Sequence, residues 1–535
     1  YTRAAASELR GKIAKALTER MERDPGNYHL RQQMLRVYRA DIKTVDAFCT
    51  ALLRENCHLL GEDARGHALR PDFRVLDENE AQVLRERVLA RTLDDFYDCL
   101  TTGSTLLADT LGAGRDDSAL EDLVLELHAK LQAQPYEDKW LEAQRAFWRA
   151  VPDKIENTPY GKILLNEVRR KARHCKNLLQ RAAQEMCAND ALNQKYAPAF
   201  LDASYQLEAL EGKTAEGWDA ARGVTIAFPR LAAVKDSDGG EMKARMKSLW
   251  DNCKETVKGF AEIFSASSDE AVEDLRTMAP AMLALIDLTA DFSRRYNEEK
   301  RRRNSADFSD QEHEAIRLLI GEDGAPTELA RIVSARYREI MVDEYQDTNE
   351  VQNRIFDAIS CKGENLFTVG DVKQSIYRFR LADPRIFLQH YNTWPPLEDA
   401  EEHDSAKLLL SRNFRSRKEV LDATNFIFCN ILSEEMGELD YGADEMLRLG
   451  ANYVESSACG AEFHLLDLPT QTGEQRVRAS EAEAAFVADY ISDMLTSEFP
   501  IQDDKTKELR PVREEDIVIL MRSPSTRLLD YRRAL

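Results

Sequence analysis

The sequence predicts a multi-domain α/β protein that carries a large all-helical insertion. The length of 535 residues exceeds what one hydrophobic core normally serves, so two to four domains are expected. Short apolar runs followed by helical segments occur between residues 339 and 432, the pattern of a parallel sheet. Residues 81–292 instead carry helical periodicity with few β-branched clusters, which predicts the insertion.

Two helices are expected before the insertion, over residues 4–21 and 41–60. Apolar residues at helical spacing predict them: Leu9, Ile13, Ala16 and Leu17 in the first, and Val45, Phe48, Leu52 and Leu53 in the second. The second helix should open near Thr44, because a threonine hydroxyl can cap a helix N-terminus.

The insertion should consist of long helices. Helical spacing predicts them over residues 80–100, 118–134, 182–210 and 267–291. A basic run at 300–303 follows, and a solvated helix end is a better interpretation of it than a DNA contact.

Strands and helices alternate after residue 337. Strands are expected at 339–342, 365–369 and 407–410, followed by a helix at 416–432. Residues 394–405, with Pro395-Pro396 and an acidic run, are typical of a linker. A strand at 461–466, a helix at 481–496 and a strand at 516–521 would continue a second α/β unit.

Composition excludes some classes of protein. The net charge of -22 repels nucleic acid on average, although a groove can be locally basic. The 9 cysteines include no CxxC pair, so no zinc or redox site is expected, and scattered thiols suggest a reduced, cytoplasmic protein. No signal peptide and no long apolar run predicts membrane association.

The string IMVDEYQDTN at 340–349 is the first candidate site. An apolar strand that ends in Asp343 and Glu344 places two carboxylates at the edge of a parallel sheet where ligands bind. We assign Asp343 to Mg²⁺ and Glu344 to the attacking water. Taken alone, such a pair is more often a solvated strand end.

The string VGDVKQSIYRFR at 369–380 is the second. Gln374 can hydrogen-bond a γ-phosphate or the attacking water. Tyr377, Phe379 and Arg380 combine rings with a guanidinium, a pattern that suits stacking on single-stranded DNA. An isolated YRFR would more often be part of the core.

Together these two strings resemble the UvrD/PcrA/RecB class of superfamily 1 helicases. SIYRFRLADP, with DVKQ before it, looks most like AddA, the helicase-nuclease subunit of bacterial AddAB. The resemblance implies RecA-like P-loop NTPase domains. A first domain (1A) would comprise 1–80 and 293–395, a helical domain (1B) 81–292, and a partial second RecA-like domain (2A) 396–535.

Further strings extend the resemblance. LSRNFRSR at 410–417 resembles motif IV, which implies Phe414 against adenine and Arg415 as an arginine finger on the γ-phosphoryl group, with ATP in the cleft between the two domains. The start of the chain resembles motif Ia, with Tyr1 and Thr2 on DNA. KTVDAFC at 43–49 resembles motif Ib, with Thr44 on DNA, although Asp46 stands where the family often has His.

The string GxxxxGK[ST] does not occur in the sequence. We therefore expect a fragment whose phosphate-binding loop lies upstream and whose nuclease domain lies downstream, and which alone hydrolyses ATP negligibly. The resemblance implies an ATP- and Mg²⁺-dependent 3′–5′ DNA helicase, an AddB-like partner and a role in double-strand break repair. A RecB- or UvrD-type helicase without AddB, or a non-catalytic DNA-binding scaffold, stays open.

Overall fold

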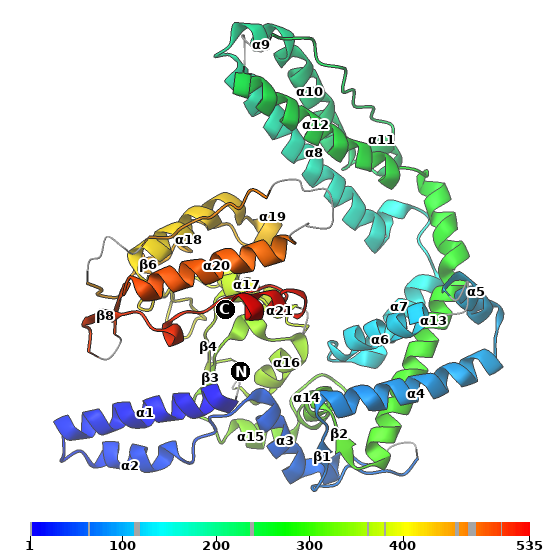
Figure 1. The fold of residues 1–535 in the computed structure, drawn as a ribbon. Helices are drawn as coiled ribbons and strands as arrows, with labels where there is room; N and C mark the ends of the chain where they lie inside the picture. The colour runs from blue at the N-terminus through cyan, green and yellow to red at the C-terminus, as the bar shows by residue number, and fades with distance from the viewer. Residues whose placement is uncertain are drawn as a thin grey trace. The chain divides into compact units, whose positions relative to one another are not determined.

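The fold was analysed in a computed structural model (Figure 1). The structure describes residues 3–62, 65–111, 118–235, 240–360, 363–378, 381–454, 460–468, 478–503 and 506–535. The chain forms two compact units. Unit 1 comprises Tyr1–Val369 and Ile376–Asp383, and unit 2 comprises Gly370–Ser375 and Pro384–Leu535.

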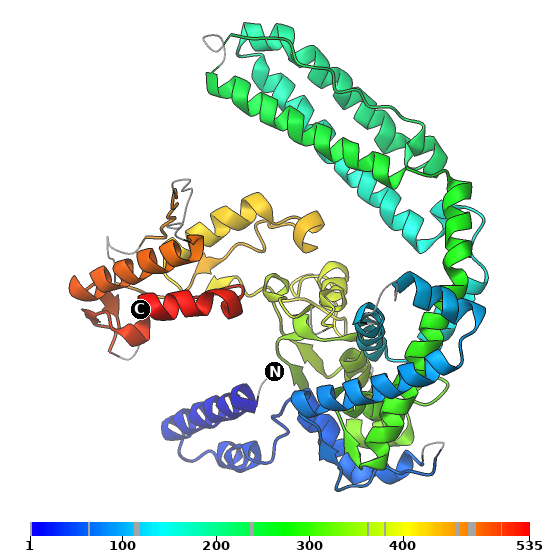
Figure 2. The ribbon, with the colours of Figure 1, turned by 45° about the vertical axis from the view of Figure 1, so that its right-hand side comes forward.

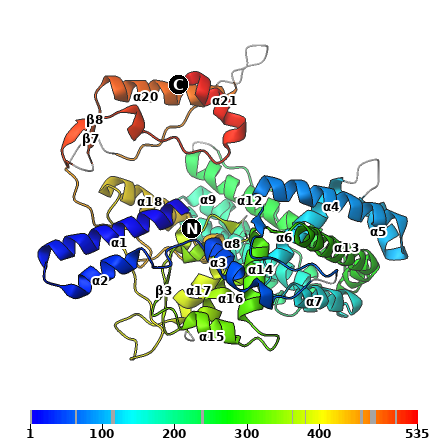
Figure 3. The same ribbon diagram turned by 90° about the horizontal axis from the view of Figure 1, so that it is seen from below.

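Unit 1 begins with three helices, α1 (Arg3–Arg23), α2 (Tyr28–Val37) and α3 (Val45–Asn56). Helices α1 and α2 lie side by side (Figure 3). The Thr44 hydroxyl accepts a hydrogen bond from the Ala47 backbone N–H, which caps α3 where the sequence predicts its start. The turn η1 (Cys57–Leu59) and the strand β1 (Arg74–Val75) follow.

A long helical segment comes next. Its elements are α4 (Glu78–Asp98), α5 (Thr102–Leu111), α6 (Ser118–Gln132), α7 (Glu137–Arg149), η2 (Ile155–Asn157), α8 (Pro159–Met186), α9 (Asp190–Lys195), α10 (Ala197–Lys213), α11 (Trp218–Arg222), α12 (Gly240–Ile263) and α13 (Ser268–Arg302). Helices α8, α10 and α12 pack side by side (Figures 1 and 2). Their core includes Phe200 stacked on Trp250, with ring centroids 4.8 Å apart.

The α/β part of unit 1 follows α13. It contains β2 (Ser305–Ala306), α14 (Phe308–Leu319), α15 (Glu328–Ser334), β3 (Ile340–Val342), η4 (Tyr345–Asp347), α16 (Glu350–Ile359) and β4 (Leu366–Thr368). Strand β1 pairs in parallel with β2, and β3 pairs in parallel with β4. Helices α3, α14, α15 and α16 share one hydrophobic core, to which Leu53, Leu319 and Ile355 contribute.

Unit 2 combines short strands with helices. Its elements are η5 (Val372–Gln374), α17 (Pro384–Thr393), β5 (Arg412–Asn413), α18 (Lys418–Ile431), α19 (Glu434–Gly437), β6 (Arg448–Leu449), α20 (Ala479–Thr496), β7 (Pro500–Gln502), β8 (Leu509–Pro511), η7 (Glu514–Asp516) and α21 (Pro524–Ala534). Strands β5 and β6 are parallel, whereas β7 and β8 form an antiparallel pair. Helices α20 and α21 pack together.

The helix predictions are largely confirmed, within a few residues at each end. The single helix expected over 182–210 is wrong, because α8 ends at Met186 and two new helices start further on. Asn189 caps α9 with its side chain, and Pro198 occupies the first turn of α10, where a missing N–H costs little. The helix expected at 267–291 instead continues as α13 to Arg302.

Three of the strand predictions are wrong. Residues 407–410, 461–466 and 516–521 form no strand, although 339–342 and 365–369 do, as β3 and β4. A strand needs a hydrogen-bonded neighbour, and Lys407 makes only a single bridge, to Pro396. The apolar residues Leu410, Phe463 and Leu520 in these segments are exposed. The α/β class holds, with helices dominating and two-stranded sheets in the described residues.

The basic run at 300–303 is not a solvated helix end. The Lys300 side chain is 1% exposed, and its ammonium donates to Asp307 over 2.9 Å and to Asp310 over 2.7 Å. Arg301 pairs with Glu314, while the next two arginines pair with Glu299. Since each cation has an acidic partner, the run serves to join α13 to α14. Within the described residues, no helix is both long and apolar enough to cross a membrane.

Candidate functional site

Asp343 and Glu344 lie on the turn that follows β3. Both are exposed, whereas the next four residues, 345–348, are buried. Two backbone bonds fix this turn to the end of β4: Val369 N–H donates to Val342 over 2.8 Å, and Tyr345 N–H donates to Val369 over 2.9 Å. The two carboxylates therefore project into solvent from a rigid, buried base.

Glu344 has a left-handed backbone conformation, with φ 52° and ψ 41°. This region is costly for a residue with a Cβ, and such strain gathers at functional sites. The Glu344 N–H donates to the Asp343 carboxylate over 3.0 Å. The Gln346 side-chain amide, which is 1% exposed, donates to Glu344 Oε2 over 2.7 Å. The conformation of Glu344 is thus held at both its backbone and its carboxylate.

A second buried carboxylate supports the same turn from α14. Glu312 accepts from the Gln352 side-chain amide over 2.6 Å and from the Asn349 amide over 3.3 Å. Asn349 also caps α16, because its side chain accepts from Gln352 N–H over 2.7 Å. Burial raises the pKa of Glu312. Burial and the nearby Glu344 raise the pKa of Asp347 as well.

Gln374 belongs to unit 2, within the η5 turn. Its side-chain amide donates to Asp371 Oδ2 over 2.9 Å, and Lys373 pairs with Asp371 Oδ1 over 2.8 Å. Asp371 therefore holds the turn together. Gln374 itself is exposed, so its amide can exchange this partner for another acceptor.

Arg415 follows β5 in unit 2. Asn413 accepts from the N–H groups of Arg415 and Ser416 over 2.9 and 2.8 Å, which folds the backbone into an Asx turn. The Arg415 side chain is exposed, and no described residue hydrogen-bonds or pairs with its guanidinium. An uncommitted guanidinium on a fixed turn can engage an anion without first breaking an ion pair.

Phe414 lies beside Arg415 and is 69% exposed. Its ring packs on Gly450, where an added Cβ would lie 2.8 Å from a ring carbon. Gly450 is held in place because its N–H donates to Asn413 over 2.8 Å. One face of the ring therefore lies against a glycine, and much of the ring remains open to a planar ligand.

The residues predicted to bind DNA are only partly described. Tyr1, Thr2, Phe379 and Arg380 lie outside the described residues. Tyr377 is half-buried in unit 1. Thr44 is 9% exposed, and its hydroxyl caps α3 as an acceptor, so its hydrogen is still available to a donor role.

The structure brings Asp343 and Glu344 together in unit 1, and places Gln374, Phe414 and Arg415 in unit 2. Sequence reasoning missed Gln346, Glu312 and Gly450. A signal for Gln346 was available, because a glutamine two residues after a strand-end acid can reach back to it. Glu312 lies 32 positions before Glu344 in the numbering and gave no local signal.

The described residues contain no cluster of three or more His, Cys, Asp or Glu side chains that could enclose a metal ion. A single exposed carboxylate suits Mg²⁺ nonetheless, since this ion is commonly held by one or two carboxylates together with water and substrate phosphates. Asp343 has that character.

Comparison with known proteins identifies the family. Residues 1–395 match UvrD-helicase, the UvrD/REP helicase N-terminal domain. The chain is 33% identical to the ATP-dependent helicase/nuclease subunit (AddA) of Ruminiclostridium cellulolyticum, over 98% of this chain and 45% of that protein. It is 34% identical to the protein of that name from Bacillus cytotoxicus and 32% to that from Listeria innocua, each over 98% of this chain and 43% of the relative. The chain thus spans somewhat less than half the length of these relatives. The match across residues 1–395 shows that the chain belongs to the UvrD/REP helicase family.

Proposed function

We propose that the protein carrying this chain is an ATP-dependent 3′–5′ DNA helicase, the motor part of a helicase-nuclease in double-strand break repair. The observation that carries the proposal is the exposed Asp343–Glu344 pair on its buried turn, with Glu344 held by Gln346. Family membership and the names of the relatives support it. RecA-like domains at 1–80 with 293–395 and at 396–535, the helical domain at 81–292, and an AddB-like partner belong to the same proposal.

Asp343 is proposed to hold Mg²⁺, which when bound would neutralise charge on the phosphate oxygens of ATP. Glu344 is proposed to orient and deprotonate the attacking water, because its carboxylate is exposed but fixed. Arg415, whose guanidinium is uncommitted, would stabilise charge on the transferred phosphoryl group. Phe414 would stack on adenine, and Gln374 would leave Asp371 to contact the γ-phosphate or the water.

DNA is the proposed substrate that this hydrolysis moves. Tyr1, Thr2, Thr44, Tyr377, Phe379 and Arg380 are the proposed contacts, on the family resemblance of the strings that contain them. Of these, Thr44 caps the helix α3, so a contact there would place a phosphate beside a helix N-terminus, where the peptide dipoles favour negative charge.

The test is Glu344→Gln in the full-length protein. We expect DNA-stimulated ATP hydrolysis to be abolished while the affinity for single-stranded DNA is unchanged, because the amide keeps the shape but cannot take a proton. Glu350→Gln is the matched control, since Glu350 is half-buried on the next helix and pairs only with Arg354. Near-normal turnover by Glu344→Gln would refute the assignment.

A further inference from the structure

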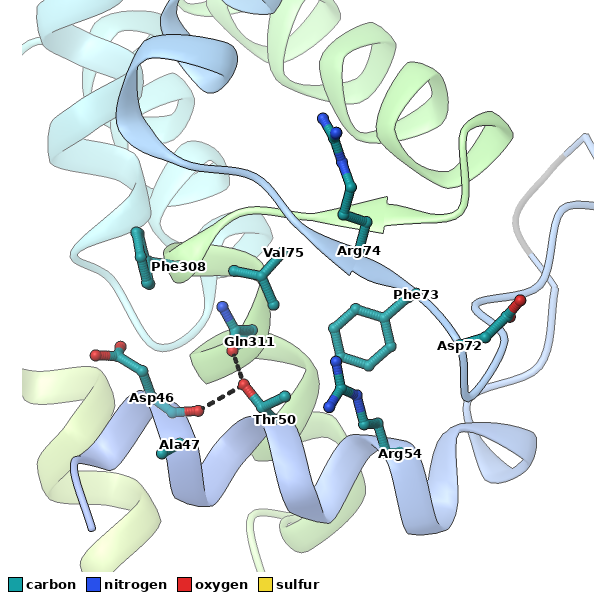
Figure 4. A pocket seen from close by; sticks show the side chains of 10 residues that line it. All are labelled: Asp46, Ala47, Thr50, Arg54, Asp72, Phe73, Arg74, Val75, Phe308 and Gln311. Carbon is teal, nitrogen blue, oxygen red and sulfur yellow. Dashed lines mark hydrogen bonds between the residues drawn. The ribbon is translucent and has the colours of Figure 1, made fainter. Parts of the chain in front are cut away.

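A pocket of about 550 Å³ lies in unit 1 against one face of α3 (Figure 4). Its walls come from α3, from the segment that enters β1, and from the start of α14. The volume is within the range of small-molecule sites, roughly 300–1,000 Å³. Helix α3 begins at Thr44, so the pocket continues the surface proposed to contact DNA.

Most charged groups of the pocket are committed to partners. Arg74 pairs with Glu80 over 2.7 Å. Asp72 accepts from the Asn304 side-chain amide over 2.9 Å. Arg54 is different: no described residue hydrogen-bonds or pairs with its guanidinium. The pocket therefore offers one uncommitted cation.

The Arg54 guanidinium is nonetheless positioned. Its central carbon lies 5.5 Å from the centroid of the Phe73 ring, and Phe73 is 1% exposed. A guanidinium over a ring is held by its face, which leaves the N–H donors at its edge for an anion. A phosphate oxygen is the acceptor that such a fork matches best.

An exposed ring lies across the pocket from Arg54. Phe308, the first residue of α14, is 44% exposed and forms no aromatic pair in the described chain. Figure 4 shows Phe308 and Arg54 on opposite sides, with Thr50 and Gln311 between them. Gln311 bonds Thr50 through its oxygen and the Asp307 carbonyl through its amide, so this wall is fixed.

We propose that this pocket binds one nucleotide unit of single-stranded DNA, with its phosphate on Arg54 and its base stacked on Phe308. A cation and a free aromatic ring on two sides of one pocket are the pair of groups that single-strand binding requires. The Asp46 carboxylate, on the wall near Phe308, disfavours a phosphate there and so orients the nucleotide. The proposal rests on DNA being the substrate.

The test measures binding of a fluorescein-labelled oligo(dT) by anisotropy, using the full 535-residue chain at several salt concentrations. Phe308→Ala should weaken binding roughly 5- to 100-fold, the effect of losing one stacked base, and Phe308→Trp should restore it. Arg54→Ala should also weaken binding and reduce the slope of log affinity against log salt by about 0.7, the effect of one lost phosphate contact. Arg54→Lys should keep that slope.

Arg331→Ala is the matched control, because Arg331 is exposed on α15 in the same unit and pairs only with Glu328. If the wild-type chain binds oligo(dT) and both pocket variants bind it equally well, the pocket proposal is wrong while the proposed function stands. If the wild-type chain does not bind oligo(dT), both fail. If the variants lose affinity for thymidine monophosphate but not for oligo(dT), the pocket serves a free nucleotide and the strand assignment is wrong.

Discussion

The buried side-chain amide of Gln346 donates to Glu344 Oε2 over 2.7 Å, two residues along the same turn. Glu344 itself has a left-handed backbone at φ 52°, which many neighbouring contacts must hold in place. The residue proposed to act on water is therefore positioned by a residue that faces the protein interior. This arrangement separates orientation from chemistry, so the two can be perturbed independently.

Gln346→Leu should lower kcat for DNA-stimulated ATP hydrolysis by about 10- to 100-fold in the full-length protein, because a misplaced base loses rate steeply. KM for ATP should change little, since Gln346 is proposed to act only through Glu344. Steady-state kinetics with thermal unfolding as the fold control checks this. A rise in KM with unchanged kcat would mean that Gln346 serves nucleotide binding instead.

Gln346→Glu probes the same contact by charge. Two adjacent carboxylates are harder to ionise together, so the acidic limb of the kcat–pH profile should move to higher pH. The loss of rate should then be recovered in part as pH rises. A profile that keeps its shape and only drops in height would show that the Gln346 side chain does not influence the ionisation of Glu344.

Arg415→Ala should lower kcat for ATP hydrolysis by about 1,000-fold or more, the usual effect of removing an arginine finger. Arg415→Lys should recover little, because an ammonium lacks the planar fork. Arg412→Ala is the control, since Arg412 is also exposed and lies three residues earlier. Equal loss in the two alanine variants would indicate a general charge effect on this surface and would remove Arg415 from the catalytic set.

Local signals predicted the parts of the molecule that depend on neighbouring residues. The apolar run before Asp343, the threonine at Thr44 and the serine at Ser267 each marked an element end that the structure confirms. The site residues Asp343 and Glu344 were found because strand and acids are adjacent. Their placement is confirmed, and their roles stay predictions.

Features that depend on distant partners could not be predicted in this way. Residues 407–410 look like a strand, but a strand exists only where another chain segment supplies a ladder. Lys300 looks solvated within a basic run, yet Asp307 and Asp310 fold back to bury it. Arg54 appears ordinary in the sequence, and only the fold places it over Phe73.

Glu312→Ala should destabilise the protein by about 1–3 kcal/mol, because the side-chain amides of Asn349 and Gln352 lose their buried acceptor. Chemical unfolding monitored by circular dichroism measures the change. Glu328→Ala, at a side chain 76% exposed on α15, should change stability by less than about 0.5 kcal/mol. If both variants unfold like the wild type, Glu312 does not secure the turn that carries Glu344.

His128 should make the stability of unit 1 depend on pH. It is 1% exposed in the core between α6 and α13, with its ring edge-on to Phe292 and Tyr296. Neither ring nitrogen has a hydrogen-bond partner in the described chain. Burial, and then the charge of Lys300, lower the pKa of His128 from 6.5 to about 3. The folded protein therefore keeps this imidazole neutral.

Between pH 6.5 and about 3 the unfolded chain binds a proton at His128 that the folded chain does not. Stability is then present above pH 6.5 and falls on acidification, by up to about 1.4 kcal/mol per pH unit from this group. His128→Leu should remove that contribution, because leucine cannot bind a proton and leaves no polar atom unpaired. The melting temperature of the variant should exceed that of the wild type by more at pH 5 than at pH 8. Melting curves that stay parallel across this range would show that His128 is not protonated on unfolding.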